Sequence, residues 1–239
     1  MPNRQVLDAA AERRRQGHHL AVREYRRYKS EVPTLIRQLG GPTQAAHDRA
    51  FRLLAKMADV VADELLAALS DPALDPVAAE EVVSLLGTAG DSRAIEPVWA
   101  FFQANRGDPE RASTAALSLA GLGDDRVLPY LRESLRTGDA ESVANAAAAM
   151  IVAGQIEDLP LLRTVHRQFK ADTGIRLGVA NAILSILGEA DPETMEHELD
   201  DIESSIADHD LWDDIWAQLE HAFGPDRYQR HYRRRSRSF

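Results

Sequence analysis

A proline that returns about every 32 residues is the feature that most constrains what this chain can fold into. Pro97, Pro129 and Pro160 are spaced by 32 and 31 residues, and Pro33 lies two such steps before Pro97. In the middle of that double step, Glu64-Leu65 stands where a proline is expected. A period of this length is typical of helix pairs that stack into a solenoid, because one pair cannot bury its own apolar face.

Each repeat reads as two helices separated by a short break. The units open near residues 32, 59, 91, 124 and 157. In the unit that opens at Asp91, the break is Gly107-Asp108-Pro109, where the aspartate supplies an oxygen for the first free N–H groups of the next helix. Alanine runs such as residues 144–149 remove side-chain bulk, so neighbouring helices approach closely. Three aromatic residues of the first helix in this unit, Trp99, Phe101 and Phe102, are predicted to pack in the core.

The chain is therefore predicted to be all-α, a right-handed α-solenoid of about five helix pairs with helical caps. We divide it into a basic N-terminal capping helix (1–30), the repeat array (31–188), acidic C-terminal capping helices (189–224) and an Arg-rich tail (225–239). The period is lost after residue 188. Met195, Leu199, Ile202 and Ile206 follow at helical spacing and are expected to form one apolar stripe, and a second stripe runs through 212–223.

The pattern resembles HEAT repeats, and most closely the short bacterial variety named after the phycobilisome lyases. The motifs that carry the resemblance are Asp91-x-Arg93-Ala94-Ile95-Glu96-Pro97, Asp108-Pro109 and Ala115-Ala116-Leu117. It covers roughly residues 31–188, and the second unit departs from it by lacking the proline. The resemblance implies stacked helix pairs that bind another protein. In the lyases of that name the repeats hold a tetrapyrrole, so a tetrapyrrole-binding lyase or chaperone-like protein is an alternative.

The two ends of the chain are basic and flank an acidic block. Residues 189–224 hold thirteen Asp and Glu and no Lys or Arg, whereas residues 225–239 hold six arginines and one aspartate. Arginine binds phosphate in a bidentate manner and aromatic rings stack on bases, so this tail suits a nucleic-acid backbone. The tail residues assigned to partner binding are Arg227, Tyr228, Arg230, Tyr232, Arg233, Arg234, Arg235 and Arg237. A solvated tail without a fixed fold and an intramolecular contact with the acidic block stay open as alternatives.

Basic residues also gather in the N-terminal helix. Arg13, Arg14 and Arg15 are consecutive and are assigned to partner binding as well. A run of charges is equally typical of a solvated helix face. If both basic ends lie on one side, a scaffold associated with nucleic acid or ribonucleoprotein is favoured.

Nothing in the chain indicates catalysis. Cysteine is absent, which excludes disulfides and thiolate chemistry. No nucleophile–base–acid set and no glycine-rich phosphate loop can be recognised. His197 lies four residues from Glu193 and from Asp201, a spacing as typical of a charged cap as of a metal site. We expect no catalytic residue, cofactor or metal, and predict a cytoplasmic, non-catalytic scaffold or adaptor that binds another protein, with no membrane-spanning segment.

Overall fold

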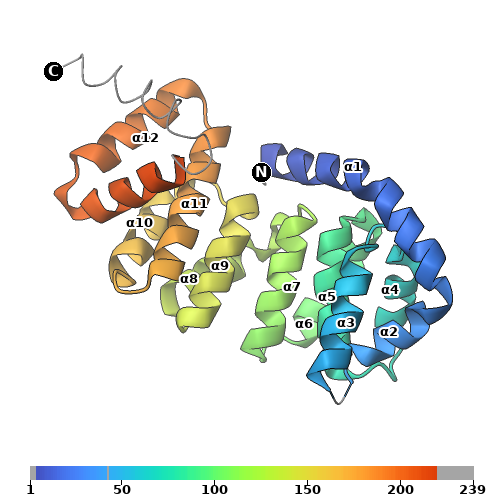
Figure 1. Cartoon of the computed structure of the whole chain (residues 1–239). Coiled ribbons are helices and arrows are strands. Elements are labelled where there is room, and N and C mark those ends of the chain that lie inside the picture. The colour runs from blue at the N-terminus through green and yellow to red at the C-terminus, as the bar shows by residue number, and fades with distance from the viewer. Residues whose placement is uncertain (1–3, 42, 220–239) are drawn as a thin grey trace.

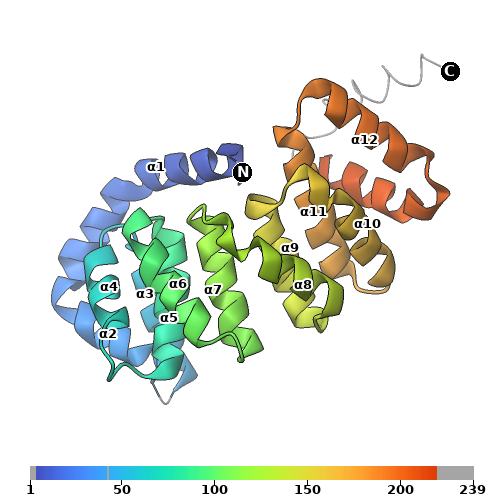
Figure 2. The same ribbon diagram turned by 180° about the vertical axis from the view of Figure 1, so that it is seen from behind.

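The chain folds into helix pairs that follow one another along an arc (Figures 1 and 2). The computed structural model describes residues 4–41 and 43–219. The first helices of the pairs are α2 (Val32–Gln38), α4 (Ala62–Leu69), α6 (Ile95–Ala104), α8 (Leu128–Thr137) and α10 (Leu159–Gln168). The second helices are α3 (Gln44–Ala55), α5 (Pro76–Ala89), α7 (Pro109–Gly121), α9 (Ala140–Ala153) and α11 (Thr173–Glu189). The all-α solenoid architecture predicted from the period is confirmed.

Aspartate residues set where four of the five second helices begin, whereas Thr43 caps α3. The side chain of Asp75 accepts hydrogen bonds from two backbone N–H groups of the first turn of α5. Asp108, Asp139 and Asp172 cap α7, α9 and α11 in the same way. Because the first N–H groups of a helix have no partner within it, each cap fixes the point at which the chain turns back.

The period predicted that the prolines occupy equivalent positions in their helices, and the structure shows that they do not all do so. Pro129 is the second residue of α8, whereas Pro97 is the third residue of α6. The turns that lead into α6 and α8 are set instead by Asp91 and Asp124, which lie 33 residues apart and whose side chains each accept a backbone N–H two residues later. Proline is tolerated at either position because the first-turn N–H groups lack partners.

Most of the core lies between the two layers of helices, and aromatic residues link consecutive pairs within it. Phe102 of α6 is 2% exposed, and its ring meets that of Tyr130 of α8 edge-on at 5.1 Å between centroids. Trp99 and Phe101 are partly buried and pack against the same core. The core role predicted for these three aromatic residues is confirmed.

Of the two apolar stripes expected after residue 188, only the first differs in the structure, since Trp212, Ile215 and Leu219 of the second contribute to the core. Helix α12 (Pro192–Ser204) buries Ile202, but Ile206 lies outside that helix and is 84% exposed. The single stripe through Ile206 is wrong because Ser205, with φ −83° and ψ 112°, is extended and ends the helix. A short turn, η5 (Ile206–Asp208), then leads into helical residues 209–219, as η4 (Ile156–Asp158) leads into α10. The repeat therefore resumes beyond residue 188, and α12 interrupts it.

Candidate interaction surfaces

The second helices pack against one another through small residues. A Cβ atom added to Gly87 of α5 would lie 2.8 Å from the Cα of Ser118 on α7, so the two backbones are closer than a side chain allows. Alanines fill the adjacent positions of α7 and α9, where they are fully or almost fully buried: Ala112, Ala115, Ala116, Ala146, Ala147 and Ala149. The consequence is a tight, continuous layer of second helices.

Polar side chains bridge neighbouring helices of this layer at steps of 34 residues. His47 of α3 lies 2.9 Å from Glu81 of α5 through Nε2 and Oε1, and Thr114 of α7 donates to Glu80 of α5 at 2.8 Å. The hydrogen bond with Glu81 raises the pKa of His47. Burial raises the pKa of Glu80, and the carboxylates of Glu110 and Glu81 act in the same direction. The carboxylates of Glu80, Glu81 and Glu110 therefore lie near enough to repel one another, and the hydrogen bond from Thr114 to Glu80 opposes that effect.

One side of the layer is left to solvent, because the others contact the first helices and the neighbouring second helices. We call it the second-helix face; on α5, α7 and α9 it comprises Val77, Glu81, Ser84, Glu110, Thr114, Leu117, Glu141, Asn145 and Ala148. Leu117, near its centre on α7, is 40% exposed. Its charged members are all carboxylates, and the neighbouring cation Arg111 lies beside Glu80 and Asp108. The face thus combines an apolar centre with an acidic surround.

Helix α1 (Arg4–Tyr28) runs along the array, over the ends of the second helices (Figure 1). At its start, the backbone N–H of Gln5 donates to Glu189 at 2.7 Å, and the Gln5 amide donates to the carbonyl of Gly188 at 3.1 Å. Near its end, the Tyr25 hydroxyl donates to Glu64 of α4 at 2.7 Å. The helix therefore spans the array from α4 to α11. An N-terminal cap, as predicted, would cover only the first helix pair.

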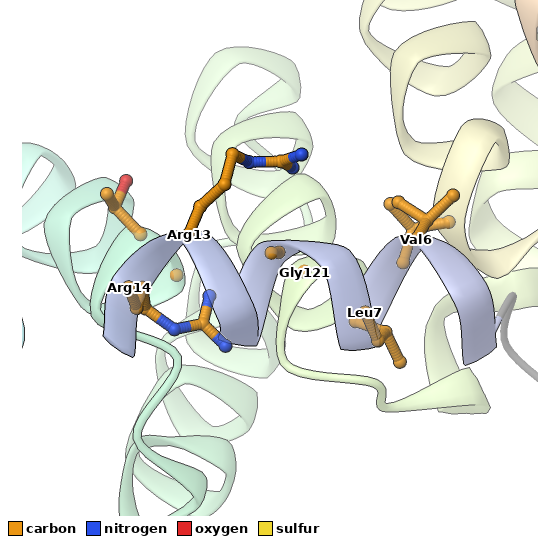
Figure 3. Close-up of a pocket in the computed structure, with 9 residues that line it drawn as sticks. Val6, Leu7, Arg13, Arg14 and Gly121 are labelled. Carbon is orange, nitrogen blue, oxygen red and sulfur yellow. The ribbon is translucent and has the colours of Figure 1, made fainter. Parts of the chain in front are cut away.

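A groove of about 410 Å³ runs beneath α1 (Figure 3). It is lined by Val6, Leu7, Ala10, Arg13, Arg14, Gly87, Thr88, Gly121 and Val152. The three consecutive arginines predicted to bind a partner are divided by the helix: Arg13 and Arg14 line this groove, on opposite sides of α1 in Figure 3, while Arg15 pairs with Glu12 at 2.7 Å.

Arg14 has a structural use in this position. Its guanidinium group lies directly against Gly90, which ends α5 in the left-handed conformation with φ 67°. The last carbonyl groups of a helix carry partial negative charge, so a cation placed there stabilises the helix end. This position gives Arg14 a structural role, while the assignment of all three arginines to partner binding stays a prediction.

Arginines in or just before the first helices form ion pairs with carboxylates of a neighbouring unit. Arg126, in the turn before α8, binds Asp124 at 2.6 Å and Glu96 of the preceding unit at 2.8 Å, and lies 4.5 Å over the ring of Trp99. Further along, the guanidinium of Arg163 on α10 binds two carboxylates of the C-terminal segment. The Asp-x-Arg spacing at Asp91 and at Asp124 is the sequence signal for the Arg126 ion pairs.

A buried ionic cluster near the C-terminal end was missed by sequence reasoning. His166 is 2% exposed, and its Nε2 lies 2.7 Å from Asp214, which also accepts two hydrogen bonds from Arg176. Burial raises the pKa of Asp214, but the hydrogen bonds from Arg176 and His166 outweigh it and lower that pKa overall. The partners are 38 and 48 residues from Asp214 in sequence, so no local pattern marks them. The cluster fastens residues 209–219 to α10 and α11.

Other predicted sites differ in what the structure says of them. The tail residues from Arg227 to Arg237 lie outside the described residues, so their role stays a prediction. In the described part of the chain, no group of three or more His, Asp and Glu side chains is placed to hold a metal ion. Asp201, which shares a predicted helix face with His197, instead binds Arg163. Among the helices of residues 4–41 and 43–219, none is long and apolar enough to cross a membrane.

Comparison with known protein families agrees with the geometry of the central repeats. Residues 62–152, from the start of α4 to the end of α9, match the family described as HEAT repeats. The match is to HEAT repeats in general, so the phycobilisome-lyase-like variety and its tetrapyrrole stay predictions. No curated protein matches the chain.

Proposed function

We propose that this array of HEAT-like helix pairs is a non-catalytic scaffold that binds another protein on its second-helix face. HEAT repeats generally mediate protein–protein interactions. The observation that carries the proposal is Leu117, a large apolar side chain 40% exposed in the middle of a helix whose neighbouring residues are tightly packed. It lies within the matched segment and at the centre of that face.

The chemistry of the face describes its partner. An apolar side chain surrounded by charged and polar groups has the form of an interface centre with a polar rim. The carboxylates of Glu110 and Glu141 favour a segment with Lys or Arg, because complementary charge raises the association rate and orients the partner. We therefore expect a partner segment that places an apolar residue on Leu117 between basic residues.

The test is affinity purification from the native cell, with and without nuclease, comparing the natural chain with Leu117→Arg. The matched control is Gln103→Arg, which adds the same side chain at an exposed position of α6, outside the second-helix face. We expect a set of nuclease-resistant proteins that Leu117→Arg loses and Gln103→Arg retains, with circular dichroism showing that both variants fold. Equal recovery by both variants would contradict the proposal. Loss of every partner on nuclease treatment would instead favour a nucleic-acid-associated scaffold.

A further inference from the structure

One line of exposed residues along α1 combines arginines with a large apolar side chain. Arg13, Gln16, Leu20, Arg23 and Arg27 follow one another at spacings of three, four, three and four residues, so they share one face of the helix. All five are exposed, and Leu20 at the centre is 46% exposed. We call this face the α1 stripe. It has one arginine seven residues before Leu20 and another seven residues after it.

The arginines of the α1 stripe have little carboxylate company, although the chain holds 38 Asp and Glu. In the part of the chain that the structure describes, no hydrogen bond or ion pair involves the side chain of Arg13, which extends away from α1 in Figure 3. Arg27 lies over the ring of its neighbour Tyr28 at 5.2 Å, and Arg23 reaches Glu24 only at 4.0 Å. The stripe therefore carries positive charge that no close ion pair with a described residue neutralises.

The fold gives Leu20 no packing role. The side of α1 that meets the array buries Ala21 and places the Tyr25 hydroxyl 2.7 Å from Glu64. Leu20 is not among the residues of the described chain that pack against its core. An exposed large apolar side chain between arginines has the form of an interface centre with a charged rim.

We propose that the α1 stripe binds an acidic helical segment of a partner protein, which places an apolar residue on Leu20. Carboxylates of that segment pair with Arg13, Arg23 and Arg27, because the guanidinium group matches a carboxylate in bidentate geometry. From Arg13 to Arg27 the stripe is about 21 Å long at 1.5 Å per residue, so about four turns of a partner helix cover it.

Leu20 is the reason to expect a protein rather than a nucleic acid. A phosphate backbone is bound through charge and hydrogen bonds, so it would use the arginines and leave Leu20 without a contact. A protein segment uses both, since an apolar centre supplies most of the affinity and the charges around it orient the partner. The effect of changing Leu20 therefore separates the two kinds of partner.

The α1 stripe and the second-helix face carry opposite charge, so they select different partners. With a basic segment on the second-helix face, as proposed above, the same chain joins an acidic partner to a basic one. This joining role rests on the proposed function, whereas binding at the α1 stripe does not depend on it.

The experiment is fluorescence anisotropy of labelled probes with the full chain at about 150 mM salt, where long-range attraction is screened. The first probe is an alanine-based helical peptide with a central Leu and with Glu three and seven residues to each side of it. The second is the same peptide with Ser in place of Leu, and the third is an oligothymidylate. We expect the first probe to bind and the other two to bind at least about tenfold more weakly.

Variants of α1 locate the binding. Leu20→Ser, and separately Arg23→Glu with Arg27→Glu, are each expected to weaken binding of the Leu peptide about tenfold or more. The matched control, Arg15→Glu with Arg26→Glu, makes the same charge change at exposed residues of the same helix outside the stripe. It is expected to change the affinity by less than about threefold. Circular dichroism shows that each variant folds.

Four results would overturn the proposal. The first is a Leu peptide that does not bind the natural chain. The second is full binding by both stripe variants, which would place the peptide elsewhere on the chain. The third is an equal loss in the control variant, which would mean that only the net charge of α1 matters. The fourth is an oligothymidylate that binds as tightly as the Leu peptide and is insensitive to Leu20→Ser, which would make the stripe a nucleic-acid site.

Failure of this proposal and failure of the proposed function are measured separately. Leu117→Arg leaves the α1 stripe intact and is expected to leave binding of the Leu peptide unchanged. Leu20→Ser leaves the second-helix face intact, so proteins that depend on Leu117 are expected to be recovered with it.

Discussion

Replacing Gly87 by alanine is expected to destabilise the array although alanine is the better helix former. Alanine in place of glycine inside a helix stabilises by about 1 kcal/mol. At Gly87, however, the new Cβ would lie 2.8 Å from both Cα and Cβ of Ser118. The backbones of α5 and α7 would have to move apart to make room for it. Overpacking of this kind costs about 1–3 kcal/mol, so the net change is expected to be about 0–2 kcal/mol destabilising.

Gly178 offers a matched control in the same layer of helices. It lies inside α11, and a Cβ added there would meet only the Cβ of Ala147 at 3.8 Å, an ordinary contact. Gly178→Ala is therefore expected to stabilise by about 0.5–1 kcal/mol. Urea unfolding followed by far-UV circular dichroism measures both free energies. If Gly87→Ala is as stable as Gly178→Ala, the close approach of α5 and α7 is not what requires glycine.

Further predictions concern the ionic contacts. Arg163→Ala leaves Asp208, whose side chain is 1% exposed, with only the more distant Arg167 at 3.7 Å, and is expected to cost up to about 3 kcal/mol. Arg136→Ala, which removes an exposed pair, should change stability by less than about 1 kcal/mol in the same urea assay. The pKa of His47 is expected above 6.5 by NMR titration and should return toward that value in Glu81→Gln. Because this pKa is raised, the contact stabilises the folded protein while His47 is protonated, and that stabilisation is lost as the pH rises through the raised pKa. Asp214 behaves in the opposite sense: its lowered pKa predicts that stability falls as the pH drops below about 4, and Asp214→Asn should flatten that fall in acid unfolding curves. An unchanged pH profile in Asp214→Asn would refute the assigned role.

What could be predicted from the sequence was the part that local chemistry controls. The aspartate caps, the breaks between helices and the alanine-rich second helices follow from backbone hydrogen bonding and side-chain size, which act within a few residues. The aromatic core residue Phe102 could be recognised for the same reason, since helical spacing shows which side of α6 is apolar. The position of Pro97 was misjudged by one residue because proline tolerates several first-turn positions, so it marks a helix start only approximately.

The sequence by itself therefore determined the repeat and its helix pairs, since these depend on capping and periodicity. Only the tertiary structure decided how α1 lies across the array, because a helix with a single buried residue, Ala21, has no apolar stripe strong enough to indicate its partner. Only the structure separated Arg13 and Arg14 from Arg15, and only it joined His166 to Asp214. Those contacts link residues tens of positions apart through charge and hydrogen bonding, which leave no period in the sequence.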